Sequence, residues 1–193
     1  MQALPAAAPP PPRRQVLVGT ALAGVAVTML FGGMLAVWVL MRERALDTEE
    51  GTWLPDGVVI PDVPANIMLI GVSALLLFAQ WAVHAARRGD RVHTGLALGL
   101  VALVGLAVIN AQAYIYNQID LPIGEGPYPG MFYAVTGTMT AALVVGVVFT
   151  AVTAFRFLGG RTNDRELVAA HALFWYLLAA VFSAVWLVVY VTK

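Results

Sequence analysis

Five apolar segments, each long enough to cross a lipid bilayer, dominate this sequence. They run over residues 16–41, 65–86, 94–116, 131–155 and 167–192, and a helix needs about 20 apolar residues to span the hydrocarbon core. None of them holds Asp, Glu, Lys or Arg well inside it. Because lipid offers the backbone no hydrogen-bond partners, such segments fold as helices. The sequence therefore predicts an all-α integral membrane bundle of five transmembrane helices.

The composition agrees with this fold class and excludes several functions. Hydrophobic residues make up 60% of the chain and charged residues 11%, against about 25% charged residues in soluble domains. The formal net charge is +0 at pH 7, so there is no basic field to attract nucleic acid, and we expect no nucleic-acid partner. The absence of cysteine excludes disulfides, thiolate metal ligands and cysteine nucleophiles.

The first apolar segment follows Arg13 and Arg14, as the apolar part of a secretory signal would. It is much longer than the roughly 7–15 apolar residues of such a signal, and no clear small-residue cleavage site follows it. We therefore expect a retained helix. Residues 1–15, rich in Ala and Pro, predict a disordered cytoplasmic tail, and residues 16–193 predict one five-helix membrane domain.

Arginines outside the apolar segments predict the orientation of the bundle. They lie before the first segment, between the second and third, and after the fourth: Arg13, Arg14, Arg87, Arg88, Arg91, Arg156, Arg161 and Arg165. Such segments usually face the cytoplasm. The other connections carry mainly acidic residues, although Arg42 and Arg44 follow the first segment. We expect the N-terminus in the cytoplasm and the C-terminus outside.

Small residues recur at helical spacing in three of the segments. The candidates for helix packing are Gly24, Thr28, Gly32, Gly95, Gly99, Gly137, Ala142 and Gly146. Small side chains let two membrane helices approach closely. The alternative is that they only reflect how common Gly and Ala are in membrane helices.

Polar residues crowd the end of the third segment: Asn110, Gln112, Tyr114, Tyr116 and Asn117. On a helix, Asn110, Tyr114 and Asn117 share one stripe, and Gln112 and Tyr116 share a second. We expect them to bind neighbouring helices or lipid headgroups; the alternative is a site for a small substrate. We assign the same polar or lipid-contact role to Asn66, His171 and Trp186.

His84, His93 and His171 fall at the predicted cytoplasmic ends of segments, where hydrogen bonding at the interface is the simplest role. A shared metal or haem site and proton exchange are the alternatives. The aromatic residues of the last segment are interpreted as membrane-interface belts. The connection containing Trp53 predicts an ordered lid or, alternatively, a docking surface. We expect no metal site and no catalytic residue, and the lack of mid-membrane carboxylates or lysines argues against a self-contained pump or channel.

Four stretches resemble subunit III of haem-copper terminal oxidases, in its short five-helix bacterial form. They are NIMLIGVS at Asn66–Ser73, GLAVINAQAYIY at Gly105–Tyr116, FYAVTGTMTAALVVG at Phe132–Gly146 and SAVWLVVY at Ser183–Tyr190. The chain departs from the family pattern at Ile115, where a Glu is usual, at Met139, Ala142 and Ala180, where histidines are usual, and at Ser183, where an Asp is usual.

The resemblance implies an accessory subunit of a cytochrome c or quinol oxidase in the bacterial plasma membrane. It implies haem and copper in partner subunits I and II, none in this chain, and bound phospholipid between helices. Family members pack against the catalytic subunit and support proton uptake and durability. The alternatives are a subunit of a nitric oxide reductase, an oxidase assembly factor, and a stand-alone membrane transporter or enzyme.

Overall fold

A computed structural model describes residues 14–48, 51–55, 57–119, 121, 126–160 and 165–192. Its helices are α1 (Gln15–Leu46), α2 (Asp62–Arg87), α3 (Arg91–Gln118), α4 (Pro127–Leu158) and α5 (Arg165–Val185), and α5 continues into a π-helical turn, η1 (Trp186–Val191). Every regular element in the described ranges is helical. Five helices are long and apolar enough to cross a membrane, which confirms the predicted fold class.

The helices extend beyond the apolar segments because polar residues build their ends. Asp90 caps α3 by accepting a hydrogen bond from the His93 backbone N–H at 3.0 Å. Pro127 occupies the first turn of α4, where its missing N–H costs nothing. The same helix ends at Leu158 with Gly159 as its C-cap, and Gly160 has φ +98, a conformation that favours glycine. Most of the predicted N-terminal tail lies outside the described residues.

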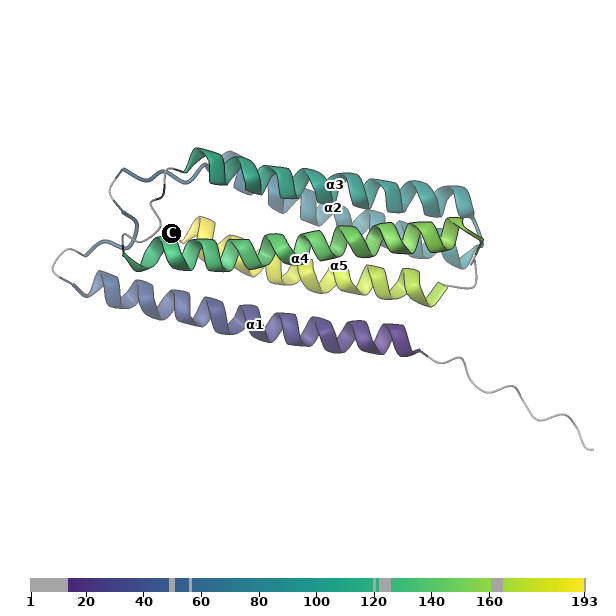
Figure 1. The fold of residues 1–193 in the computed structure, drawn as a ribbon, viewed down its shortest axis with the longest axis horizontal. Coiled ribbons are helices and arrows are strands. Elements are labelled where there is room, and N and C mark those ends of the chain that lie inside the picture. The colour runs from purple at the N-terminus through teal and green to yellow at the C-terminus, as the bar shows by residue number, and fades with distance from the viewer. Residues whose placement is uncertain are drawn as a thin grey trace, which may run out of the picture.

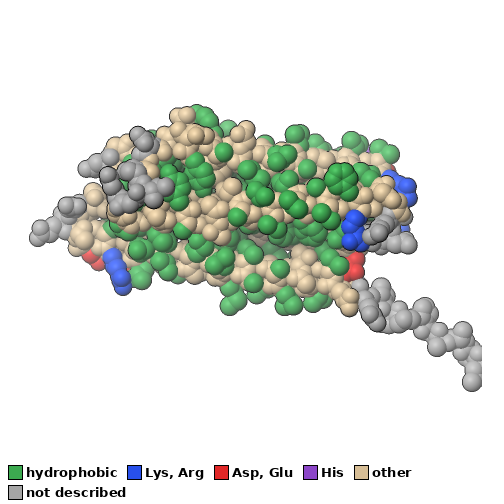
Figure 2. All heavy atoms as spheres, viewed as in Figure 1, with side chains coloured by type: hydrophobic (Ala, Val, Ile, Leu, Met, Phe, Trp, Pro, Cys, Tyr) green, Lys and Arg blue, Asp and Glu red, His purple; other side chains and the backbone are tan. Residues whose placement is uncertain are grey.

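Helices that follow one another along the chain run antiparallel, and the chain begins and ends at opposite ends of the bundle (Figure 1). α2 pairs with α3, and α3 packs on α4. α5 contacts α1, α2 and α4, so it joins the two sides of the bundle. Figure 2 shows apolar side chains along the flank and charged side chains at the two ends, the distribution that a bilayer requires.

α1 is the most weakly embedded helix. Within it only Gly24, Phe31 and Trp38 are buried, at intervals of seven residues, and they form the line that faces the bundle. Its two ends are fastened to α5: the Leu17 backbone N–H donates to Glu166 Oε1 at 3.1 Å, and Arg42 donates to the Thr192 carbonyl oxygen at 3.1 Å. α1 is therefore held by one seam and two end contacts.

An aromatic cluster closes the end of the bundle where α1 finishes and α4 begins. The rings of Trp38, Trp53 and Tyr128 are buried and meet edge to face, with centroids 5.3–5.5 Å apart. Such contacts are favourable beyond the apolar area that they bury. Trp53 fixes the α1–α2 connection on the bundle, as the predicted ordered lid requires.

Candidate functional site

A buried polar cluster joins α4 to α5 at one level of the bundle. Thr150 Oγ1 lies 2.8 Å from His171 Nε2, and Trp175 Nε1 donates to both, at 3.1 and 3.0 Å. Thr150 also donates to the Gly146 carbonyl oxygen at 2.8 Å. All three side chains are fully enclosed. Hydrogen bonds between helices compensate polar groups that have left water.

The interface role expected for His171 is wrong. Its side chain is 0% exposed and faces into the bundle, where Phe149 contacts it edge to face at 5.7 Å. Trp175 and Tyr190 are also buried, so the interpretation of the aromatic residues of α5 as interface belts fails for these two. The sequence gives their positions along the helix, but the rotation of the helix about its axis decides whether they face lipid or the core. The spacing of His171 and Trp175 at i and i+4 puts both side chains on one face of the helix, and this spacing was the sequence signal for a shared hydrogen bond.

The two polar stripes predicted on α3 separate as expected. Gln112 and Tyr116 face the bundle: Tyr190 donates to Gln112 Oε1 at 2.7 Å, and Tyr116 donates to Thr136 Oγ1 at 2.8 Å. Asn110, Tyr114 and Asn117 are exposed, and Asn117 donates to the Ala113 carbonyl oxygen of its own helix at 3.0 Å. One stripe thus ties α3 to its neighbours, and the other is open to the surroundings.

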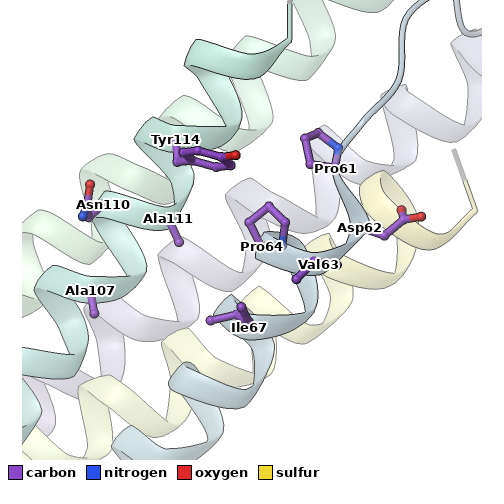
Figure 3. Close-up of a pocket in the computed structure, with 9 residues that line it drawn as sticks. All are labelled: Pro61, Asp62, Val63, Pro64, Ile67, Ala107, Asn110, Ala111 and Tyr114. Carbon is purple, nitrogen blue, oxygen red and sulfur yellow. The ribbon is translucent and has the colours of Figure 1, made fainter.

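A groove of about 580 Å³ lies between the start of α2 and the second half of α3 (Figure 3). Its residues are Pro61, Asp62, Val63, Pro64, Ile67, Ala107, Asn110, Ala111 and Tyr114. Tyr114 reaches from α3 toward Pro61, so that its hydroxyl lies at one end of the groove. The groove combines a polar end with an apolar wall.

The small residues predicted to pack helices divide into two groups. A Cβ added at Gly146 would lie 2.8–2.9 Å from Phe174 and Trp175, one at Gly95 would lie 3.1 Å from Leu158, and one at Gly24 would overlap the Leu177 side chain. At Gly32 and Gly99, by contrast, no atom lies within 4 Å. A Cβ added at Gly137 would lie 4.0 Å from the Tyr116 hydroxyl, an ordinary contact distance. Ala142 is half-buried. Thr28 is exposed, and its hydroxyl donates to the Gly24 carbonyl oxygen of its own helix. Gly71 and Gly105, which were not predicted, also sit in close contacts.

Asn66 and Trp186 line a second hollow, of about 430 Å³, between α2 and the end of α5, together with Asp62, Ala65, Tyr190 and Val191. The other two histidines lie near the arginine-rich end. His84 is exposed, and His93 Nδ1 lies 2.6 Å from Asp90 Oδ2. The hydrogen bond from the His93 backbone N–H lowers the pKa of the exposed Asp90 carboxyl. Over the described residues, no three His, Asp or Glu side chains gather as a metal site would need.

Polar side chains of the described residues thus join neighbouring helices, as at Gln112 and Tyr190, or line grooves on the flank of the bundle. Residues 14–193 match the family described as cytochrome c oxidase subunit III. The chain belongs to the cytochrome c oxidase subunit III family.

Individual proteins named cytochrome c oxidase subunit 3 are similar in sequence to this chain. The chain is 28% identical to the rat protein named cytochrome c oxidase subunit 3 over 173 residues, covering 87% of this chain and 64% of the rat protein. It is 27% identical over 195 residues to the probable cytochrome c oxidase subunit 3 of Rickettsia bellii, covering 94% of this chain and 70% of that protein. The zebrafish (Danio rerio) protein named cytochrome c oxidase subunit 3 is 28% identical over 190 residues, with 95% and 70% covered. The chain thus spans about two thirds of these subunit III relatives.

Where this chain departs from the usual subunit III pattern, the structure puts small or apolar side chains. Ile115 and Met139 are buried in the apolar core, and Ala142 packs against it. Ala180 and Ser183 lie exposed on α5. The polar ties of this bundle consequently fall elsewhere, at Gln112 with Tyr190 and at Thr150 with His171 and Trp175.

Proposed function

We propose that this chain is a non-catalytic accessory subunit III of a respiratory haem-copper oxidase in a bacterial plasma membrane. In this proposal it packs against subunits I and II, which hold the haem and copper of aerobic electron transport. The family match over residues 14–193 carries the proposal. The structure supports it, because buried polar side chains join neighbouring helices, as Tyr190 does with Gln112 and as Trp175 does with Thr150.

Purification of the tagged full chain in mild detergent tests this proposal. We expect haem absorbance to co-elute with the chain, mass spectrometry to find the catalytic subunit, and the fraction to consume oxygen. Turnover with nitric oxide but not oxygen would point instead to a nitric oxide reductase. Elution without any haem protein, in membranes that contain an active oxidase, would contradict the proposal.

A supporting role in proton uptake and durability also belongs to the proposal. A complex prepared without this chain should start with comparable turnover per haem and then lose activity faster during repeated turnover than the complete complex. Equal half-lives of activity for the two preparations would exclude this role, and only a role in assembly of the complex would remain. The complete complex, prepared in parallel from the same membranes, is the control.

We further propose that the groove between α2 and α3 holds a phospholipid. Its apolar wall suits an acyl chain, and the Tyr114 hydroxyl at its end can donate a hydrogen bond to a headgroup. Ala107→Trp would fill the groove, whereas Ala113→Trp places the same side chain on an exposed position of α3 outside it. Lipid phosphorus per purified chain should fall for the first variant only. An equal phosphorus content in both would exclude this groove.

The orientation is proposed from the arginines. Single cysteines at Gly89 and Gly160 should be protected from an impermeant thiol reagent in intact cells, and one at Gly124 should react. The absence of native cysteine makes the background clean. Reaction at Gly89 in intact cells would reverse the orientation.

A further inference from the structure

α5 exposes two small side chains, Ala180 and Ser183, between two of its neighbours. With the larger Tyr176 before them and Leu187 of η1 after them, they form an exposed row at intervals of four, three and four residues, which lies along one side of the helix. On one side of this row, Tyr176 donates to Gln80 Oε1 of α2 at 3.3 Å. On the other side, Ala180 and Ala184 line a groove of about 290 Å³ shared with α1. The row is thus the floor of a valley between α1 and α2.

The α2 wall of this valley carries polar side chains at a regular interval. Asn66, Ser73 and Gln80 are exposed and lie seven residues apart. Asn66 borders the hollow that α2 shares with Trp186 and Tyr190, and Gln80 contacts Tyr176, so both ends of the row adjoin α5. The α1 wall offers Thr28, Gly32 and Leu35 around the 290 Å³ groove. We call these three rows the α5 valley.

At least one of the valley's two amides lies too deep in the bilayer to reach water. The Asn66 side chain makes no hydrogen bond within the described ranges. The Gln80 side chain makes one, in which its Oε1 accepts from Tyr176. At 1.5 Å per residue the two amides lie about 21 Å apart along α2, less than the hydrocarbon thickness of about 30 Å. They therefore cannot both reach water at opposite membrane faces. Lipid tails cannot hydrogen-bond an amide, whereas a protein side chain can.

The outward face of α4 shows the opposite character. Its exposed positions include Val144, Val145, Val148, Val152 and Phe155, which acyl chains solvate well and which leave no polar group unpaired. Small side chains on the valley floor permit close approach of another backbone. A polar interval of seven residues matches the repeat along which two membrane helices stay in contact at a shallow crossing angle. Acyl chains have no such repeat.

From these observations we propose that the α5 valley receives one transmembrane helix of a partner polypeptide in the oxidase complex, a helix that carries hydrogen-bonding side chains opposite Asn66 and Gln80. This inference rests on the proposed function, since it names the surface by which the accessory subunit meets its partner. Ala180 and Ser183 admit the partner's backbone, and the groove beside Gly32 accepts one of its larger apolar side chains.

Site-specific photocrosslinking in membranes that contain the whole complex tests the inference. A benzophenone amino acid replaces Ala180 in the valley or, as the matched control, Ala141 on the exposed face of α4. After irradiation the tagged chain is purified, its haem absorbance is recorded, and crosslinked peptides are identified by mass spectrometry. We expect the Ala180 variant to crosslink to a peptide from a membrane-spanning segment of the co-purifying haem protein, and the Ala141 variant to crosslink to lipid.

Several results would overturn the inference while haem still co-elutes and the proposed function stands. They are lipid adducts alone at Ala180, a crosslink to a second copy of this chain, or a crosslink to the haem protein from Ala141 but not from Ala180. Elution without haem contradicts the proposed function itself. In that case an adduct at Ala180 with an identified transmembrane peptide still supports a helix-binding valley, and lipid adducts alone refute it.

A second pair of variants measures how much a polar side chain of the α2 row contributes to retention of the partner, without adding side-chain volume. Gln80→Leu should release the partner about threefold more readily when detergent is raised, the factor that one average membrane hydrogen bond supplies. Asn117→Leu removes an exposed amide that already bonds to its own helix and should leave retention unchanged. Equal retention of the partner by the two variants, together with the absence of the Ala180 crosslink, would overturn the inference.

Discussion

α5 meets α4 and α1 by different means. Against α4, the contact lies in the middle of both helices, where Gly146 gives room to Trp175 and where Thr150 and His171 are hydrogen-bonded. Against α1, the hydrogen bonds lie at the ends, at Glu166 and Arg42, and between them Gly24 packs on Leu177 while a groove remains beside Gly32. The α4 contact is fixed by shape and polar pairing, whereas the α1 contact leaves space within the membrane.

This difference separates the α4–α5 contact, where the side chains fit closely, from the α1–α5 contact, where space remains for another side chain. Substitutions in the closed α4–α5 contact should cost folding free energy in the isolated chain. Substitutions along the open α1–α5 contact should cost little there and act mainly when a partner is present. The following predictions test that division, beginning with the largest expected effect.

Replacing Gly146 with Leu should destabilise the isolated chain most. The new side chain has no room beside Phe174 and Trp175, whose rings lie 2.8–2.9 Å from an added Cβ. Overpacking of this kind costs about 1–3 kcal/mol. Thermal unfolding of the purified chain in detergent measures the loss, with Gly99→Leu as the control at an open position. Equal melting temperatures for the two variants would place the α4 face outside the core.

Gly24 and Gly32 should respond differently although both occur on α1. Gly24→Leu must displace the Leu177 side chain, whose flexible end can yield, so we expect a loss near 1 kcal/mol, the lower end for overpacking. Gly32→Leu meets open space and should stay within about 0.5 kcal/mol. The same thermal unfolding assay compares them. A larger loss for Gly32→Leu than for Gly24→Leu would show that the seam of α1 is assigned to the wrong face.

Removing the Thr150 hydroxyl should weaken the α4–α5 contact by a smaller amount. Thr150→Val keeps the shape but removes the acceptor for Trp175 and the partner of His171. Membrane hydrogen bonds average about 0.6 kcal/mol each, so the combined loss should be about 1 kcal/mol. Thr138→Val is the control, because that hydroxyl bonds only to its own helix at Ala134. Unfolding in denaturant should separate the two, and identical midpoints would show that the cluster contributes no stability.

The smallest effect is expected at the end of α1. Glu166→Ala removes the acceptor for the Leu17 backbone N–H and a negative charge beside a helix N-terminus, an interaction of about 0.3–1 kcal/mol. Amide hydrogen exchange in the first turn of α1 should accelerate, while exchange in α4 stays as in the parent chain. Arg165→Ala alters the neighbouring exposed charge and should not change exchange at Leu17. Unchanged exchange in the Glu166→Ala variant would leave α1 held by its seam alone.

The sequence sufficed for the number and approximate limits of the helices because each has a long apolar segment, and their lengths follow from the bilayer. It also sufficed for the two stripes of α3, since helical spacing determines which residues share a face. It could not rank the glycines: Gly24 and Gly32 belong to one series at intervals of four, yet only Gly24 faces Leu177. In an almost uniformly apolar helix no polar side marks its rotation, and for the same reason His171 was assigned to the interface.

The end contacts of α1 bear on the order in which the chain is made. The partners of Leu17 and Arg42 lie 149 and 150 residues later, so α1 is synthesised well before the residues that bond to its two ends. Until α5 enters the membrane, Gly24 of α1 has no Leu177 to pack against. We therefore expect α1 to dock fully only after α5 has been inserted.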